Sequence, residues 1–149
     1  MKIAVIGLGF VGLTLSSVLA SKGITTIGID SDRKKCSKIA EGIPTFFEPN
    51  LENTLKKALR KKLSVTNNLF SIINCDFIFV TVGTPQKKNG ETDLSSIKAV
   101  VRSIGKLISK NKKKPIILIK STVIPGTTKG VILPILERNS KKKAGKDFG

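Results

Sequence analysis

The sequence predicts an α/β fold in which a doubly wound parallel sheet is covered by helices on both faces. Short apolar runs rich in β-branched residues alternate with segments of helical periodicity from the first residues onward. Glycines close several of the helical segments, as they do at helix C-termini. The length, 149 residues, corresponds to one domain, which we assign to residues 1–149.

Five strands are expected from runs of apolar and β-branched residues, at residues 2–6, 25–29, 63–66, 76–82 and 115–120. These runs are mostly apolar throughout, with little alternation, which is typical of strands buried on both faces. Because helical segments separate them, the strands are expected to be parallel and joined by crossovers. The sequence closes on Asp147-Phe148-Gly149, which resembles the opening of another element, so we expect the sheet to stop short of its last strand.

The intervening segments predict helices at residues 10–22, 32–41, 51–62, 94–110 and 126–138, with a helical turn at residues 68–73. In the first helix, we expect a buried stripe of Val11, Leu15, Val18 and Leu19. In the helix at residues 94–110, the expected apolar side consists of Ile97, Val100, Val101, Ile104 and Ile108. Pro134 predicts a bend in the last helix. Irregular structure is predicted elsewhere, at residues 43–50, 83–93 and 140–146.

Composition excludes several functional classes. No apolar run reaches the roughly 18 residues of a membrane-spanning helix, and residues 1–6 lack the flanks of a signal peptide, so we predict a cytoplasmic protein. The absence of histidine argues against the usual zinc sites and excludes His-dependent nucleophiles, so no metal is expected. Cys36 and Cys75 form no CxxC motif and are interpreted as small packing residues.

The net charge of +17 raises the question of nucleic-acid binding. The lysines occur in short separate runs near expected helix ends and loops, and the sequence has no Trp or Tyr for base stacking. We therefore interpret the charge as a solvated surface that helps to attract anionic small ligands. A nucleic-acid-binding domain is kept as an alternative, motivated by the charge alone.

A glycine motif follows the first expected strand and opens the first expected helix: Gly7-Leu8-Gly9-Phe10-Val11-Gly12. In this context GxGxxG predicts a Rossmann-type dinucleotide site. Gly7 permits the tight turn, Gly9 lets a pyrophosphate approach the backbone, and Gly12 lets the helix pack closely on the strand. The unpaired N–H groups at the helix start would then face the phosphates.

Asp30 ends the second expected strand, where a carboxylate can accept hydrogen bonds from the adenosine ribose. The same charge repels a 2′-phosphate, so NAD is preferred over NADP, although Arg33 and Lys35 nearby weaken that preference.

Four further segments follow in register: residues 42–51 (GIPTFFEPNL), 82–85 (VGTP), 89–94 (NGETDL) and 120–128 (KSTVIPGTT). Together with the glycine motif, they resemble the N-terminal domain of the UDP-glucose/GDP-mannose dehydrogenase family over essentially the whole chain. The residues that follow the fourth and fifth expected strands would lie at the carboxyl edge of the sheet, where such folds bind ligands.

The resemblance implies roles for individual residues. Val11 would offer a backbone N–H to the pyrophosphate, Lys35 would lie near the adenosine ribose, and Thr84 would contact NAD. Thr122 matches a family threonine that lies near the nicotinamide and helps to hold a catalytic water. Phe10 replaces a tyrosine common in this loop. The full expected cofactor-binding set is Gly7, Gly9, Phe10, Val11, Gly12, Asp30, Lys35, Gly83, Thr84, Pro85, Ser121 and Thr122.

The family oxidises the C6 alcohol of a nucleotide sugar to a carboxylate, with two NAD+ and a covalent thioester to a cysteine. The resemblance places that cysteine beyond Gly149, so we expect this chain alone to be inactive and the full-length enzyme to be a homo-oligomer. The expected substrate is UDP-glucose or a related UDP- or GDP-sugar, with GDP-mannose and UDP-N-acetylmannosamine as the alternatives. Residues 124–127 and 140–149 look closer to GDP-mannose enzymes. A non-catalytic NAD-sensing module is the alternative of another class.

Overall fold

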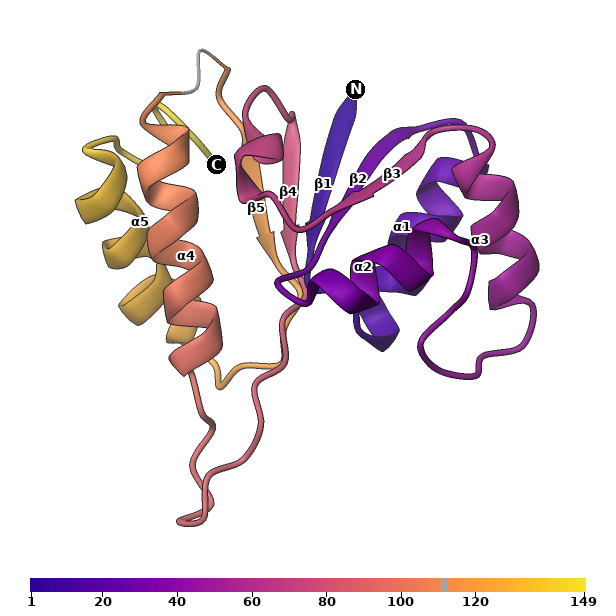
Figure 1. Cartoon of the computed structure of the whole chain (residues 1–149). Coiled ribbons are helices and arrows are strands. Elements are labelled where there is room, and N and C mark those ends of the chain that lie inside the picture. Colours follow the sequence, from indigo (N-terminus) through magenta and orange to yellow (C-terminus); the bar gives the residue numbers. More distant parts are fainter. Residues whose placement is uncertain (111–112) are drawn as a thin grey trace.

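The computed structural model describes residues 1–110 and 113–149. Its centre is a five-stranded parallel sheet with the strand order β3-β2-β1-β4-β5 (Figure 1). The strands are β1 (Lys2–Ile6), β2 (Thr25–Ile29), β3 (Leu63–Thr66), β4 (Phe77–Val80) and β5 (Ile116–Ile119). All five lie within the predicted runs, and the predicted parallel sheet is confirmed. Strand order reverses at β1, so a crevice opens beyond the carboxyl ends of β1 and β4.

Helices cover both faces of this sheet (Figure 1). Helices α4 (Ser95–Ile108) and α5 (Leu133–Ser140) lie on one side, and α1 (Phe10–Ser21) and α3 (Leu51–Leu59) on the other. Helix α2 (Arg33–Ala40) follows β2, and a short 3₁₀ turn, η1 (Leu69–Ile72), follows β3. None of the helices among the described residues is both long and apolar enough to cross a membrane.

Each face has its own hydrophobic core. Between the sheet and α4, the predicted stripe of α4 is confirmed, with Ile97, Val101 and Ile104 fully buried. On the opposite face, α1 and α3 pack together around Leu13 and Leu55, which are also fully buried. Burying each of these side chains contributes about 1.5–3 kcal/mol, so the two cores hold the strand ends in fixed positions.

The predicted stripe of α1 is wrong. Val11 and Val18 are 52% and 39% exposed, while the buried face is made of Gly12, Leu13, Ser16, Ser17 and Ala20. The reason is the close approach of this helix to the sheet: a Cβ on Gly12 would lie 1.8 Å from the Gly7 carbonyl oxygen. Position 12 must therefore be glycine, and the buried residues other than Leu13 are small, so apolar periodicity alone selects the wrong face.

Two helix boundaries differ from the prediction for local reasons. Helix α3 ends at Leu59, before the predicted residue 62, because the Lys62 carbonyl accepts a bond from the Thr26 N–H at 2.9 Å and so leads into β3. The bend expected at Pro134 takes the form of one wide π turn, η2 (Thr128–Ile132), directly before α5. Pro134 then lies in the first turn of α5, where its missing N–H costs little.

The last residues pair with the edge of the sheet. Gly149 accepts a bond from the Ile117 N–H at 2.8 Å and donates to the Pro115 carbonyl at 3.0 Å. Phe148 is 4% exposed and belongs to the core beneath α4. The last residues are therefore anchored to β5 and to the core beneath α4.

Helix α4 packs on α5 through Gly105, where an added Cβ would lie 2.8 Å from the Asn139 Cβ. We predict that Gly105→Ala lowers the free energy of unfolding by about 1–3 kcal/mol, because the two helices must separate. Gly130→Ala is the matched control: its Cβ would meet nothing within 4 Å, and the change should be neutral or slightly stabilising. Urea denaturation measures both, and equal stability of the two variants would contradict this packing.

Candidate dinucleotide-binding site

The glycine loop leaves β1 at Gly7, whose N–H donates to the Ile29 carbonyl at 2.8 Å. Gly7 has a φ of +98°, which non-glycine residues rarely adopt. A Cβ there would also lie 2.9 Å from the Val82 backbone nitrogen. The chain therefore needs glycine at this turn for two reasons, its backbone conformation and its contact with the residues after β4.

Helix α1 begins with open backbone donors. Its first helical bond runs from the Leu13 N–H to the Gly9 carbonyl, at 2.9 Å. Among the described residues, nothing accepts a hydrogen bond from the N–H groups of Gly9, Phe10, Val11 or Gly12. The helix also has no side-chain cap and no acidic residue in its first turn. Such a helix start has the donors and the dipole that stabilise a bound anion.

The other two glycines of the loop differ in their surroundings, as the sequence predicted. A Cβ on Gly9 would meet nothing within 4 Å, so open space lies above this residue. A Cβ on Gly12 would collide with the Gly7 carbonyl and lie 2.6 Å from the Thr81 hydroxyl. Gly9 therefore keeps room for a ligand, whereas Gly12 allows the helix to pack.

Asp30 lies at the carboxyl end of β2 and is buried. One carboxylate oxygen accepts bonds from the Leu8 N–H at 2.8 Å and from Lys35 Nζ at 2.9 Å. The other oxygen accepts from the Asp32 N–H at 3.0 Å. Asp30 thus fastens the glycine loop to the end of β2 and holds the Lys35 ammonium beside it.

The ionisation of Asp30 reflects these contacts. Burial by itself would raise the pKa of this carboxyl, since it disfavours the charged form. The Asp32 N–H, the Lys35 ammonium and the Leu8 N–H together outweigh burial and bring the pKa below its ordinary value of 3.8. Asp30 is therefore a carboxylate at neutral pH.

A hollow of about 610 Å³ lies over the glycine loop at the carboxyl edge of the sheet. Six of the predicted residues line it: Gly7, Gly9, Asp30, Lys35, Gly83 and Pro85. The remaining lining residues, which the sequence did not single out for the site, are Ile6, Ile29, Ser31, Asn67, Leu69, Thr81, Val82, Ser96, Ala99 and Val100. The hollow therefore spans from the end of β2 to the first turns of α4.

Phe10 and Val11 do not line the hollow with their side chains. Phe10 is 68% exposed and contacts Phe46 of the irregular segment, with the ring centroids 4.2 Å apart. The expected contact of Val11 with the pyrophosphate uses its backbone N–H, which is one of the open donors at the start of α1. The side chains at both positions instead face outward.

Thr84, Ser121 and Thr122 lie beside the hollow and join the loops that follow β4 and β5. The Thr84 hydroxyl donates to the Thr122 carbonyl at 2.6 Å, and the Ser121 hydroxyl donates to the Val82 carbonyl at 2.6 Å. The two loops are thereby held together at the carboxyl ends of neighbouring strands. The contact of these three residues with a cofactor remains a prediction.

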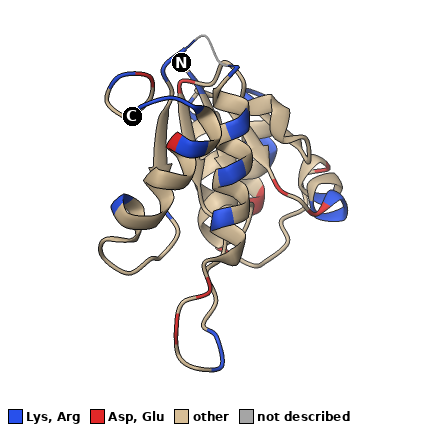
Figure 2. Cartoon of the chain, turned by 90° about the vertical axis from the view of Figure 1, so that its left-hand side faces the viewer, with Lys and Arg blue, Asp and Glu red and all other residues tan. Residues whose placement is uncertain are grey.

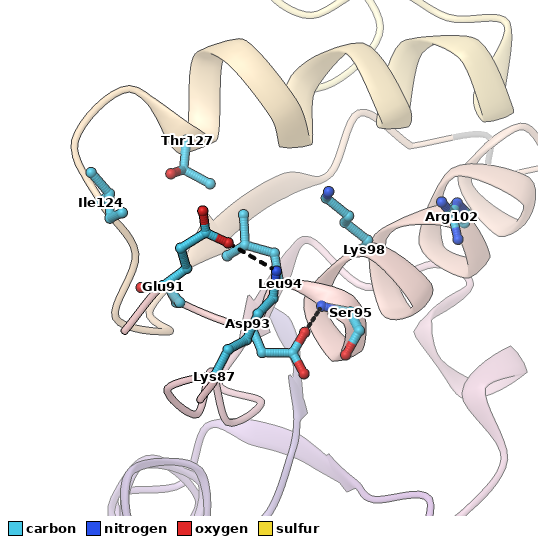
Figure 3. Close-up of a pocket in the computed structure, with 10 residues that line it drawn as sticks. Lys87, Glu91, Asp93, Leu94, Ser95, Lys98, Arg102, Ile124 and Thr127 are labelled. Atoms are coloured by element: carbon cyan, nitrogen blue, oxygen red, sulfur yellow. Dashed lines mark hydrogen bonds and ion pairs between the residues drawn. The ribbon is translucent and has the colours of Figure 1, made fainter. Parts of the chain in front are cut away.

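A second hollow, also of about 610 Å³, opens between residues 87–95, the outer side of α4 and the approach to η2 (Figure 3). Its acidic groups already have partners: Asp93 accepts from the Ser95 N–H at 2.8 Å, and Glu91 pairs with Lys87 at 3.3 Å. The residues that line it include none of the GxGxxG motif. The two volumes are alike, but the open amides at the start of α1 border the first hollow, which makes it the candidate dinucleotide site.

Lys and Arg are spread over several helices and loops (Figure 2), in agreement with the interpretation of a solvated basic surface. Within the described part of the chain, no three His, Cys, Asp or Glu side chains are grouped so as to hold a metal ion. Both cysteines are buried, and burial raises the pKa of each thiol. Neither is therefore poised as a nucleophile.

The comparison with protein families identifies this arrangement. The model of the UDP-glucose/GDP-mannose dehydrogenase family, NAD binding domain, matches residues 1–149. The chain belongs to this family. The resemblance stated from the sequence is confirmed, and NAD is the cofactor of the domain.

Relatives and solved structures agree with this assignment. GDP-mannose 6-dehydrogenase of Pseudomonas aeruginosa is 38% identical over the whole chain, and that of Pseudomonas syringae pv. tomato is 40% identical. The crystal structure of a ternary complex of the P. aeruginosa GDP-mannose dehydrogenase superposes with a TM-score of 0.97, and a UDP-glucose dehydrogenase from Pyrobaculum islandicum with 0.90 at 30% identity. The chain spans 35% of the P. aeruginosa protein and 34% of the other two.

The lowered pKa of Asp30 predicts a pH-dependent contribution to stability. At pH 7, Asp30→Asn should lower the free energy of unfolding by about 1–3 kcal/mol, because the Leu8 N–H and Lys35 lose a charged acceptor. Since the folded-state pKa lies below 3.8, this contribution is fully present above that value and disappears as the pH falls through the folded-state pKa. Urea denaturation of both proteins from pH 7 to pH 2 measures it. A stability difference that stays constant over this range would contradict the assignment.

Proposed function

We propose that the protein carrying this domain is a nucleotide-sugar 6-dehydrogenase that oxidises the C6 alcohol of GDP-mannose to the uronic acid with two NAD+. The family membership supports the reaction class. The preference for GDP-mannose over UDP-glucose rests on the 38% identity and TM-score of 0.97 with the GDP-mannose enzyme, against 30% and 0.90 with the UDP-glucose enzyme. UDP-glucose and UDP-N-acetylmannosamine remain the alternatives.

The observation that carries the cofactor site is the set of open N–H groups at residues 9–12 beneath the space above Gly9. A pyrophosphate placed there meets backbone donors and the positive end of the α1 dipole. Its approach requires that no side chain stands on Gly9. The loop thus fits the diphosphate of NAD through its backbone alone.

Asp30 and Lys35 provide the ribose end of the proposed site. A carboxylate offers about four acceptor positions, and three donors already occupy Asp30. Room for about one ribose hydroxyl therefore remains, and the Lys35 ammonium can act as a donor beside it. The negative charge of Asp30 repels a 2′-phosphate, which supports NAD over NADP.

Thr84, Ser121 and Thr122 are proposed to form the nicotinamide end, where the loops after β4 and β5 meet. Bound NAD+ supplies the hydride acceptor; the residues of this chain hold and orient it. The nucleophilic cysteine and the sugar-binding residues are proposed to belong to the remainder of the full-length enzyme, which we propose to be a homo-oligomer.

An NAD-sensing module is the second candidate function. It would share the glycine loop and Asp30, because these residues serve binding alone. The joined loops after β4 and β5 favour the dehydrogenase, since a sensor has no need of ordered hydroxyl groups at the nicotinamide end. Catalysis by the full-length protein separates the two.

Gly9→Ala tests the cofactor site. The variant should fold with unchanged stability, because nothing lies within 4 Å of the new methyl group, and should bind NAD+ at least tenfold more weakly, because the methyl group occupies the pyrophosphate position. Titration calorimetry measures binding. Gly130→Ala, which adds the same methyl group in η2 and away from the glycine loop, is the control and should leave the affinity for NAD+ unchanged. Unchanged affinity in Gly9→Ala would contradict this placement of the diphosphate.

The substrate proposal is tested with the full-length protein. NADH formation followed by absorbance should show two NADH for each GDP-mannose consumed and a higher kcat/KM for GDP-mannose than for UDP-glucose. Residues 1–149 alone should form no NADH with either sugar. A higher kcat/KM for UDP-glucose would overturn the substrate assignment, and NAD+ binding without turnover of any nucleotide sugar would favour the sensing module.

A further inference from the structure

Thr81 is the first residue after β4, and its side chain reaches across to the glycine loop. The Thr81 hydroxyl lies 2.7 Å from the Gly7 carbonyl oxygen and 2.9 Å from the Ile6 carbonyl oxygen. The Ile6 carbonyl already accepts the Thr81 backbone N–H at 2.8 Å. We therefore assign the hydroxyl proton to the hydrogen bond with the Gly7 carbonyl. This carbonyl has no other donor among the residues that the structure describes.

The same peptide group is held at its other end. The peptide between Gly7 and Leu8 carries the Gly7 carbonyl on one side and the Leu8 N–H on the other. The carbonyl accepts from Thr81, and the N–H donates to Asp30 at 2.8 Å. Two side chains from different strand ends thus fix the plane of one peptide group at the start of the loop.

The orientation of this peptide determines where the loop goes next. Gly7 has no side chain to restrict its dihedral angles, so the following peptide rotates more easily than it would after another residue. The next residue, Leu8, is fully buried, and the open N–H groups begin at Gly9. Rotation of the Gly7–Leu8 peptide would move those donors away from the position that a pyrophosphate occupies.

We propose that Thr81 is a positioning residue for the cofactor: its hydroxyl fixes the Gly7–Leu8 peptide and so presets the pyrophosphate-binding amides. The inference rests on the proposed function, because it assigns Thr81 to the same dinucleotide site. Thr81 acts through the Gly7 carbonyl. Its effect should therefore appear with ligands that carry a pyrophosphate and be absent with ligands that lack one.

The test compares Thr81→Val, which loses the donor, with Thr81→Ser, which keeps it. Thr81→Ala is included because it does not place a methyl group against the carbonyl and so guards against misfolding of Thr81→Val. Thr54→Val is the matched control, since the Thr54 hydroxyl bonds the Asn50 carbonyl on the exposed side of α3. Binding of NAD+, ADP-ribose and adenosine is measured by NMR titration, and folding by thermal denaturation.

Thr81→Val and Thr81→Ala should bind NAD+ and ADP-ribose roughly five- to tenfold more weakly, as expected for the loss of one ordering hydrogen bond. Adenosine affinity should be unchanged, Thr81→Ser should be close to the unmodified chain, and Thr54→Val should match it for all three ligands. Two results would contradict the role of Thr81 and leave the proposed function standing. One is equal NAD+ affinity in folded Thr81→Ala and the unmodified chain; the other is a loss of adenosine affinity as large as the loss of NAD+ affinity. Failure of the unmodified chain to bind NAD+ would overturn the proposed function as well.

Discussion

The bond between the Leu8 N–H and the Asp30 carboxylate, 2.8 Å long, connects the first strand-to-helix turn with the neighbouring strand. The rest of the site depends on it. Leu8 is held by this bond and Gly7 by Thr81, directly after β4. The loop then enters α1 with four N–H groups that have no partner among the described residues. The two hydrophobic cores fix the strand ends from which Asp30 and Thr81 project. Packing of apolar side chains on both faces of the sheet therefore fixes the positions of the backbone N–H donors at its edge.

The strands were predictable because their runs are rich in apolar and β-branched residues, as is usual in a sheet covered by helices. Strands β1 and β2 are largely buried, whereas β5 at the edge of the sheet is only partly buried. The predicted stripe of α4 was also correct, since this helix packs with large side chains at ordinary spacing. The buried face of α1 was predicted wrongly because the helix start approaches the sheet closely at Gly12. Apart from Leu13, the buried residues of α1 are Gly, Ser and Ala, while Val11 and Val18 are exposed, so the apolar pattern does not mark the buried face.

The geometry of the candidate site was predictable where it depends on glycine positions and strand ends. The glycine spacing predicted the turn and the packing of Gly12, and Asp30 followed from its place at the end of β2. Thr81 was missed because its partner, Gly7, lies 74 residues away and no local motif marks the contact. The position directly after a buried strand was the available signal. The bond from Thr84 to Thr122, across 38 residues, was equally invisible, because pairing of β4 with β5 has to be known first.

Open backbone amides at the start of α1 are proposed to bind the pyrophosphate of NAD. A ¹H–¹⁵N NMR titration of residues 1–149 with NAD+ tests it most directly, because every amide is observed separately. We expect saturable shifts that are largest for the N–H groups of Gly9, Phe10, Val11 and Gly12. The shift of the Leu13 N–H should be small, because this group is already bonded to the Gly9 carbonyl. Saturable binding that leaves the glycine-loop amides unshifted and perturbs residues 87–95 instead would contradict it.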